Sequence, residues 1–194
     1  MSMRVWKVTA TLVMLASFGA AEATAQRGGG FQLAPLLMET DAFPDGGLVP
    51  LKYAARGENV QPGFRFSNAP EGTVSYAIIF HDLDVAIGGG TGDVLHWLAW
   101  NIPASAGGIA EGGLPEGSVQ GRNLMGQNVY MGPGAPPGPR DHHYVFELYA
   151  LNVTLDLPAT AGRDELIAAM ERQGRREGGV RRPLSRAGIA WGPT

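Results

Sequence analysis

The chain contains no cysteine. It therefore has no disulfide bond and no thiol nucleophile, and it cannot bind zinc or an iron–sulfur cluster through thiolates. A hydrophobic core must stabilise the fold instead, and hydrophobic residues make up 44% of the sequence. The 194 residues suit a single domain built around such a core.

Positive charge is also scarce. Lysine and arginine together number 15, against 18 acidic residues, which gives a formal net charge of −3. Nucleic acids select strongly basic surfaces, because contacts to the phosphate backbone supply much of their binding energy. We therefore expect no nucleic-acid partner.

Long apolar runs are missing except near the N-terminus. There Arg4 and Lys7 precede the apolar run Val8–Ala21, which is shorter than the roughly 20 residues that a membrane span needs. Ala23-Thr24-Ala25 then supplies a small-x-small cleavage site. The sequence thus predicts a signal peptide over residues 1–25, a flexible leader over 26–30, and a periplasmic or secreted protein without stable membrane insertion.

Glycine and proline are abundant, with 29 and 14 residues, and they favour short strands joined by structured loops. Two apolar runs, Val74–Phe80 and Val94–Trp100, are predicted to be central strands on either side of a polar loop. Tyr144–Leu151 is predicted to be a third strand, and Arg163–Arg172 a helix. Because the strands follow one another through turns, we expect a mainly β fold of two packed antiparallel sheets with a C-terminal helix.

Strict alternation along the second of these strands divides its side chains between two faces. One face would carry Val94, His96, Leu98 and Trp100, and the other Leu95, Trp97, Ala99 and Asn101. A histidine that shares a face with apolar side chains is typical of a protein core.

Polar groups that can carry chemistry gather at the ends of these strands. Asp82 and Asp84 are two residues apart, so their side chains point the same way in an extended segment. Carboxylates and imidazoles can bind a divalent metal, or the carboxylates can orient and protonate histidines that receive an anion. A turn with self-capping aspartates would give the same pattern. The four histidines are His81, His96, His142 and His143.

A loop rich in proline and glycine, residues 132–138, precedes the last two histidines. Its prolines hold the shape of the loop before a ligand arrives. Its glycines offer backbone N–H groups, and a nest of such groups suits phosphate or carboxylate oxygens.

In combination, these segments resemble the phosphatidylethanolamine-binding protein (PEBP) family, in its bacterial Raf-kinase-inhibitor-like branch. The family's first motif, Asp-Pro-Asp-Ala-Pro followed by His-Trp and Asn-Ile-Pro, is similar to Asp82-Leu83-Asp84-Val85-Ala86, His96-Trp97 and Asn101-Ile102-Pro103. The second motif is similar to Gly132-Pro133, Pro136-Pro137, Gly138, His142-His143-Tyr144 and Phe146.

The resemblance implies a PEBP-like antiparallel β-sandwich over residues 31–172, with a C-terminal helix near a pocket for phosphate-like and carboxylate-like anions. Carried over position by position, it implies that the ligand-binding residues are Asp82, Asp84, His96, Tyr130, Gly134, Pro136 and His142. We expect no catalytic residue, because a Ser-His-Asp triad would need a serine in the motif stretches and these contain none. We also expect no metal and no cofactor.

The chain also departs from the family pattern. Leu83 and Ala86 replace the two prolines of the first motif, which frees the φ angles of that loop. His143 replaces an arginine and removes a permanent cation, and His81 stands where an aromatic or apolar residue is usual. The Arg-rich C-terminal tail, residues 173–194, does not match the family's ending. It is predicted to be a solvated helix end or a patch for acidic partners.

The leading hypothesis is an exported binding protein whose pocket holds a small anionic ligand, such as a phospholipid head group. Asp82 would hold His96 or His142 as a donor, and both histidines and the loop N–H groups would contact the ligand oxygens. One alternative is a metal-dependent hydrolase that uses Asp82, Asp84, His96 and His142. Another is a protein inhibitor of a peptidase or kinase, which would bind its protein partner through surface loops such as residues 104–128.

Overall fold

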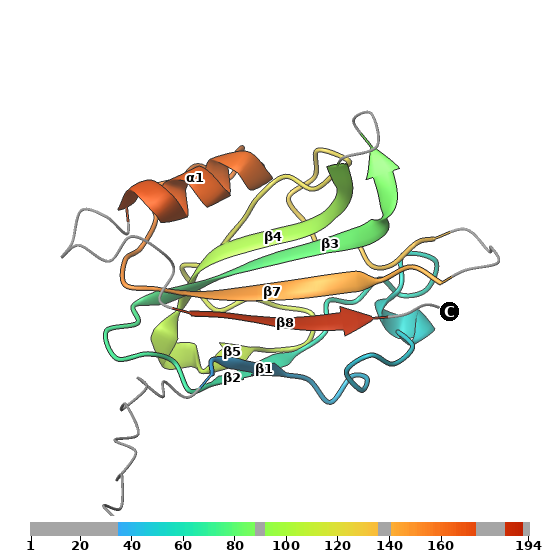
Figure 1. Ribbon diagram of the computed structural model, residues 1–194, viewed down its shortest axis with the longest axis horizontal. Coiled ribbons are helices and arrows are strands. Elements are labelled where there is room, and N and C mark those ends of the chain that lie inside the picture. Colours follow the sequence, from blue (N-terminus) through green and yellow to red (C-terminus); the bar gives the residue numbers. More distant parts are fainter. Residues whose placement is uncertain (1–34, 88–91, 136–140, 174–184, 192–194) are drawn as a thin grey trace, which may run out of the picture. The chain divides into compact units, whose positions relative to one another are not determined.

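The computed structural model describes residues 35–87, 92–135, 141–173 and 185–191. The predicted signal peptide, the predicted leader and Pro136 lie outside these residues. Within them the chain is mainly β, with two antiparallel sheets and one α-helix (Figure 1). The predicted fold class is therefore confirmed.

The larger sheet has the strand order β6-β4-β3-β7-β8. Its three inner strands, β4, β3 and β7, correspond to the three strands predicted from the sequence, although β3 and β4 are longer than the apolar runs. The bounds are β3 (Ser75–Ile87), β4 (Gly92–Pro103), β6 (Val119–Gln120), β7 (Tyr144–Leu151) and β8 (Ser185–Trp191).

The smaller sheet has the order β1-β2-β5. Its strands are β1 (Leu37–Glu39), β2 (Phe64–Ser67) and β5 (Gly108–Ile109). Two short 3₁₀ helices, η1 (Leu51–Tyr53) and η2 (Ala104–Ala106), lie in the connections between the strands.

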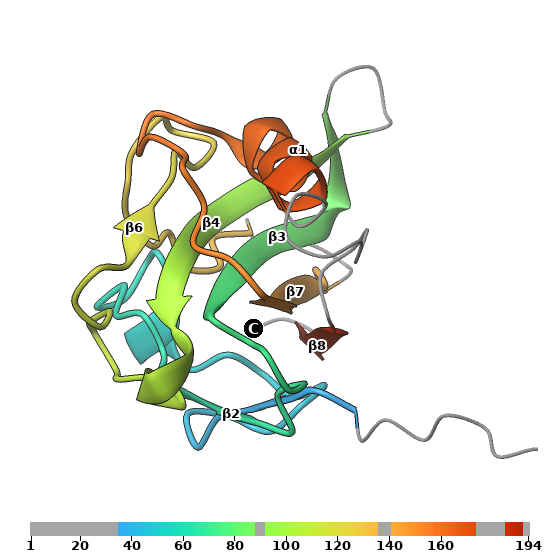
Figure 2. The same cartoon turned by 90° about the vertical axis from the view of Figure 1, so that its left-hand side faces the viewer.

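The two faces of the larger sheet have different coverings (Figures 1 and 2). The smaller sheet covers one face, over a cluster in which the rings of Phe80 and Phe146 stack with their centroids 3.8 Å apart. On the other face, α1 (Arg163–Gln173) buries Leu166, Ala169 and Met170 against the sheet. The predicted helix is therefore confirmed. Among the described residues, no helix has the length and apolar character needed to cross a membrane.

The edge strand β8 was not predicted. It pairs along β7 in antiparallel register, from Trp191 opposite Tyr144 to Ser185 opposite Ala150. This strand falls within residues 173–194, which we expected to form a tail beyond the domain. That expectation needs correction, because β8 hydrogen-bonds to the edge of β7 and so extends the sheet to Trp191.

A β-bulge interrupts β4 at His96. Phe80 on β3 pairs with Trp97, and the next residue of β3, His81, pairs with Leu95, so His96 has no partner on β3. A bulge of this kind turns two consecutive side chains to the same side of a sheet. His96 and Trp97 therefore both lie near Phe80, on the face that carries the aromatic cluster.

A second bulge lies near the end of β4. Tyr76 pairs with Ile102 and Ile78 pairs with Ala99, which leaves one extra residue in β4 between the two pairs. Asn101 lies in this interval and has a positive φ of 56°. The two bulges restore the original alternation beyond them.

The strict alternation predicted for β4 is therefore wrong between the two bulges. Trp97 and Ala99 lie on the face with the aromatic cluster, as His96 does, while Leu98 and Trp100 lie on the face covered by α1. The alternation of side chains in the sequence does not reveal an unpaired residue inside a strand, because the bulge depends on the pairing with β3.

Candidate functional site

A cavity of about 290 Å³ opens near the end of β3 and the start of β7. Its walls come from β3, β4 and β7, from the residues after η1 and from the loop 131–135. Four of its described lining residues have polar side chains, and the others are apolar or glycine. These lining residues are Ala55, Asp82, Val85, Val94, His96, Met131, Gly132, Gly134, Ala135, His142 and Tyr144.

Asp82 is almost completely buried, with 2% of its surface exposed. Its Oδ1 accepts the backbone N–H of Asp84 at 2.9 Å, and its Oδ2 lies 2.7 Å from Nδ1 of His142. Because a carboxylate only accepts hydrogen bonds, His142 carries a proton on Nδ1, and its Nε2 is left for a ligand. Of the two histidines that we expected Asp82 to hold, it holds His142.

Tyr144 stands directly opposite Asp82 in the ladder between β3 and β7. Its hydroxyl accepts the backbone N–H groups of Gly134, at 3.3 Å, and Ala135, at 3.1 Å. Burial and the nearby charge of Asp82 raise the pKa of Tyr144 to about 12, so the phenol is neutral at physiological pH. The sequence did not identify this pocket residue, because its place at the start of an apolar strand marks it as core. Only the antiparallel pairing with β3 brings it beside Asp82.

His96 lines the cavity from the first bulge of β4 and is 5% exposed. Its Nδ1 lies 2.9 Å from the carbonyl oxygen of Met131 and 3.2 Å from that of Gly132. The carbonyls accept, so the proton sits on Nδ1 and Nε2 remains for a ligand. Burial lowers the pKa of His96 below its ordinary value, although the two carbonyls and the charge of Asp82 oppose this shift.

Asp84 does not line the cavity. Its Oδ2 lies 2.7 Å from Nδ1 of His143, and it also accepts the backbone N–H of His143. That backbone hydrogen bond is the main cause that lowers the pKa of Asp84. The pairing of β3 with β4 becomes irregular after Asp82, and Asp84 lies outside the cavity that Asp82 lines. Each aspartate holds a different histidine.

Tyr130 is buried and does not line the cavity either. Its ring stacks on Phe80 with 5.6 Å between the centroids and meets Trp97 edge-on at 5.7 Å. Its hydroxyl donates to the carbonyl oxygen of Tyr53 at 3.0 Å. Tyr130 therefore supports the aromatic cluster next to the cavity, and these contacts leave it no direct route to a ligand.

In the described part of the Pro/Gly loop, the backbone N–H groups donate hydrogen bonds to side chains of the protein itself. Gly132 donates to Oδ1 of Asn59 at 2.8 Å, and Gly134 and Ala135 donate to the hydroxyl of Tyr144. Pro133 has no N–H to offer. The expected nest of free donors is therefore not found in residues 132–135. Gly134 still lines the cavity, whereas Pro136 lies outside the described residues.

The four side chains that we grouped as metal ligands do not gather at one point. Asp82 pairs with His142, Asp84 pairs with His143, and Nδ1 of His96 faces main-chain carbonyls. In the part of the chain that the structure describes, no three histidine, cysteine, aspartate or glutamate side chains are grouped to hold a metal ion. The geometry thus does not bring together the four metal ligands that the metal-dependent hydrolase hypothesis requires.

His81 lies on the opposite face of the sheet from its neighbour Asp82. Its Nδ1 is 2.5 Å from Oδ2 of Asp93, and Asp93 also forms an ion pair with Arg163 at the start of α1. Burial opposes the shift, but the hydrogen bond with His81 and the charge of Arg163 lower the pKa of Asp93. This unusual histidine therefore joins the sheet to α1 and does not enter the cavity.

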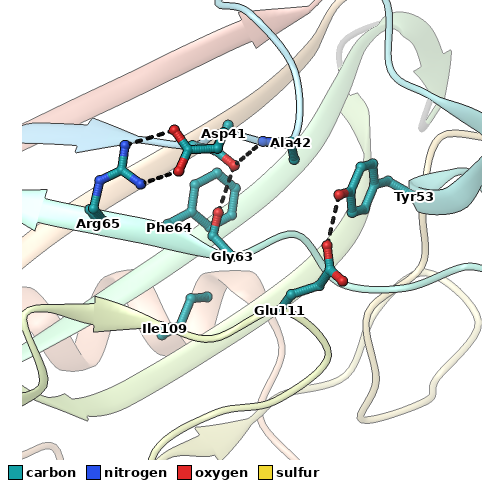
Figure 3. A pocket seen from close by; sticks show the side chains of 9 residues that line it. Asp41, Ala42, Tyr53, Gly63, Phe64, Arg65, Ile109 and Glu111 are labelled. Atoms are coloured by element: carbon teal, nitrogen blue, oxygen red, sulfur yellow. Dashed lines mark hydrogen bonds and ion pairs between the residues drawn. The ribbon is translucent and has the colours of Figure 1, made fainter.

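A second cavity, of about 390 Å³, lies between η1 and the smaller sheet (Figure 3). Its charged groups pair with one another. Arg65 makes hydrogen bonds of 2.5 and 3.0 Å to Asp41, while Glu111 pairs with Lys52 and accepts the hydroxyl of Tyr53. No ligand-binding residue predicted from the sequence lines this larger cavity, so the cavity beside Asp82 is the candidate site.

Comparisons with known proteins agree with the motifs. The sequence model of the family described as phosphatidylethanolamine-binding protein matches residues 39–180. A UPF0098 protein from Pyrococcus abyssi is 38% identical over 151 residues, which cover 74% of this chain and 80% of the relative. Mycobacterium tuberculosis LppC, whose name assigns it provisionally to the lipoproteins, is 36% identical over 127 residues, covering 66% of this chain and 61% of LppC. Neither name specifies a catalytic activity.

Solved structures share the fold. CT736 from Chlamydia trachomatis, provisionally described as a PEBP homologue, has a TM-score of 0.68 and 28% identity, covering 81% of this chain and 96% of CT736. Escherichia coli YbcL, described as a member of the mammalian PEBP family, has a TM-score of 0.69 and 26% identity, covering 82% of this chain and 98% of YbcL.

Proposed function

This chain belongs to the phosphatidylethanolamine-binding protein family, and from that membership we propose that its cavity binds a small anionic ligand with a phosphate or carboxylate group. In this proposal the protein is an exported binding protein and not an enzyme. The observation that carries the proposal is the convergence of Asp82, His96, His142 and Tyr144 on one cavity.

Two imidazoles supply the contacts to the anion. Nδ1 of His142 faces the carboxylate of Asp82, and Nδ1 of His96 faces the carbonyls of Met131 and Gly132. Both rings are thus oriented before a ligand arrives, which reduces the entropy lost on binding. When a ring carries a proton on both nitrogens and is positively charged, its Nε2 donates a charge-assisted hydrogen bond to a ligand oxygen.

The rest of the cavity favours a small group. Its volume of about 290 Å³ is near the lower end of the range for ligand pockets. Apolar side chains, among them Val85, Val94 and Met131, form much of the lining and keep the local dielectric constant low. The cavity therefore suits a head group or a comparably small anion.

The lining also supports binding without catalysis. Among the described lining residues there is no serine, threonine, cysteine or lysine. Asp82 and His142 resemble the acid and base of a hydrolase, but they have no such nucleophile beside them to activate. Ser75 lies elsewhere on β3, where its hydroxyl donates to the carbonyl oxygen of Val153 at 2.6 Å.

Export is part of the same proposal. The N-terminal sequence has the features of a cleaved signal peptide, and the provisional lipoprotein name of LppC supports a location in the cell envelope. We therefore place the mature protein in the periplasm or outside the cell. Its ligand is then a small anion that is available there.

Ligand titration followed by histidine side-chain NMR tests this function. Inorganic phosphate and O-phosphoethanolamine would be added to the mature protein, which starts at Gln26. We expect the signals of His96 and His142 to shift and saturate at millimolar concentrations, with smaller shifts for His81 and His143. No response of His96 and His142 at these concentrations would show that the proposal is wrong.

A further inference from the structure

The described lining residues of the candidate cavity offer more hydrogen-bond acceptors than donors. Asp82 contributes a buried carboxylate. A neutral His96 contributes Nε2 as another acceptor, because Met131 and Gly132 hold its proton on Nδ1. No lysine or arginine is present among the described lining residues. Among these described residues, only the two imidazoles can supply positive charge to an incoming anion.

Backbone donors do not relieve this shortage in the described part of the loop. Gly134 and Ala135 already donate to Tyr144, and Gly132 donates to Asn59. In the described residues, neither Nε2 of His96 nor Nε2 of His142 has a hydrogen-bond partner. These two ring nitrogens are thus the polar atoms best placed to meet the ligand.

A ligand that keeps a proton satisfies both nitrogens. Its O–H group donates to Nε2 of His96, while a charged oxygen accepts from Nε2 of His142, whose positive form has Asp82 as counter-ion. A tetrahedral anion without a proton offers only acceptors, so one negative oxygen would face the lone pair of His96. A buried polar site rejects a ligand that leaves its hydrogen-bonding groups unpaired.

Resting on the proposed anion-binding function, we infer that the cavity selects inorganic phosphate or phosphomonoesters that carry a P–OH group over sulfate and phosphodiesters. His96 is the residue that determines this specificity. The natural ligand is then inorganic phosphate or a phosphomonoester, and not the diester head group of an intact phospholipid.

Isothermal titration calorimetry of the mature protein at about pH 6, where a substantial fraction of a phosphomonoester still carries its second proton, tests the inference with four probes. Inorganic phosphate should bind at least about tenfold more tightly than sulfate. O-Phosphoethanolamine should bind at least about tenfold more tightly than glycerophosphoethanolamine, which has the same amine but a phosphodiester. The second pair separates the effect of the P–OH group from that of the amine.

The pH dependence gives a second readout on the unmodified protein. Sulfate carries no proton in mildly acidic solution, so its affinity should rise as His96 becomes protonated and Nε2 turns into a donor. The phosphate preference should shrink over the same range. His96→Gln, whose amide can donate at the position of Nε2, should also reduce the preference. His143→Gln is the matched control and should keep it, because that ring pairs with Asp84 outside the cavity.

The outcomes separate the two proposals. Sulfate that binds as tightly as phosphate at about pH 6 overturns the selectivity but leaves the anion-binding function standing. Failure of all four probes to bind overturns both. Should His96→Gln not fold, the pH series decides, and a phosphate preference that does not shrink with falling pH overturns the inference.

Discussion

Asp82 is the residue on which the candidate pocket most depends. Its carboxylate accepts hydrogen bonds from the backbone N–H of Asp84 and from Nδ1 of His142. A buried carboxylate needs such partners, because an unpaired buried charge costs several kcal/mol. Asp84 shares the motif but pairs with His143 at an exposed position. The two aspartates therefore have different tasks.

Substituting each aspartate by asparagine should separate these tasks. Asp82→Asn places an amide beside His142 and removes its counter-ion, so phosphate affinity should fall by at least about tenfold. The free energy of unfolding should fall by about 2 kcal/mol, since hydrogen bonds to a charged group are lost. Calorimetric titration and urea denaturation measure the two effects.

Asp84→Asn is the comparison variant. From the geometry we expect its phosphate affinity to stay close to that of the unmodified protein, because the side chain lies outside the cavity. The family resemblance alone predicts a loss similar to that of Asp82→Asn. Equal losses for both variants would therefore refute the division of tasks read from the structure.

At the scale of elements, Asn101 shapes the second bulge of β4. Its φ of 56° lies in the left-handed region, which asparagine tolerates better than most residues. Its side chain donates to the carbonyl oxygen of Leu155 at 3.0 Å and accepts the backbone N–H of Leu155 at 2.8 Å. One residue thus fixes the bulge and ties β4 to the segment before α1.

Two substitutions at this position should distinguish backbone strain from hydrogen bonding. Asn101→Gly keeps the left-handed conformation but loses both hydrogen bonds, which should lower the free energy of unfolding by about 2 kcal/mol. Asn101→Ala loses the same hydrogen bonds and adds backbone strain, for a total of about 3 kcal/mol. Urea denaturation measures both values, and an alanine variant more stable than the glycine variant would disprove the role of φ.

The sequence predicted those elements whose signal is local. Tyr144–Leu151 is bounded as predicted because its apolar run starts and stops abruptly, and α1 follows from the apolar stripe that contains Leu166 and Met170. The strand β8 was missed because Ser185–Trp191 contains Gly188 and only two large apolar residues, Ile189 and Trp191, so its sequence signal is weak and its structure depends on pairing with β7.

The candidate site was predictable only in part, for the same reason. Asp82, His96 and His142 were identified from the motif, and all three line the cavity. Tyr144 and the outward position of Asp84 depend on the register of β3 with its neighbours. The lack of free N–H groups in residues 132–135 of the loop depends on Tyr144 and Asn59, which come from other parts of the chain.

At the scale of the whole molecule, one sheet serves two hydrophobic cores. Ile78 and Phe80 face the smaller sheet, while the alternate residues Ala77 and Ile79 face α1. With no cysteine in the chain, stability rests on these cores and on the polar groups buried with them. Charging a buried group therefore weakens the fold as a whole.

The free energy of unfolding should consequently fall as the solution becomes acidic. The folded protein lowers the pKa of His96 from 6.5. Below that value the unfolded chain binds a proton first, so stability falls as the pH falls. The lowered pKa values of Asp84 and Asp93 add a second loss below the ordinary aspartate value of 3.8, as these carboxylates become protonated. Urea denaturation over a pH series in phosphate-free buffer measures both steps.

His96→Asn is the control for the first step. Asparagine keeps a donor for the carbonyls of Met131 and Gly132 but does not titrate. This variant should lose the stability change that begins near 6.5 and retain the one at lower pH. A parent protein that becomes more stable between neutral pH and about 5 would contradict the sign of the effect.

Each bulge of β4 shifts the alternation of side chains between the two faces by one residue, and the second shift cancels the first. Val94 and Ile102 face the same side of the sheet, as they would in a regular strand, because the second extra residue cancels the first. Deleting one residue from either bulge would move the side chains of one part of β4 to the opposite face of the sheet. Deleting one residue from each bulge would leave Val94 and Ile102 on the same face. Changes in the length of this strand are therefore tolerable only in pairs, and the place of His96 in the pocket depends on Asn101 at the other end of the shifted segment.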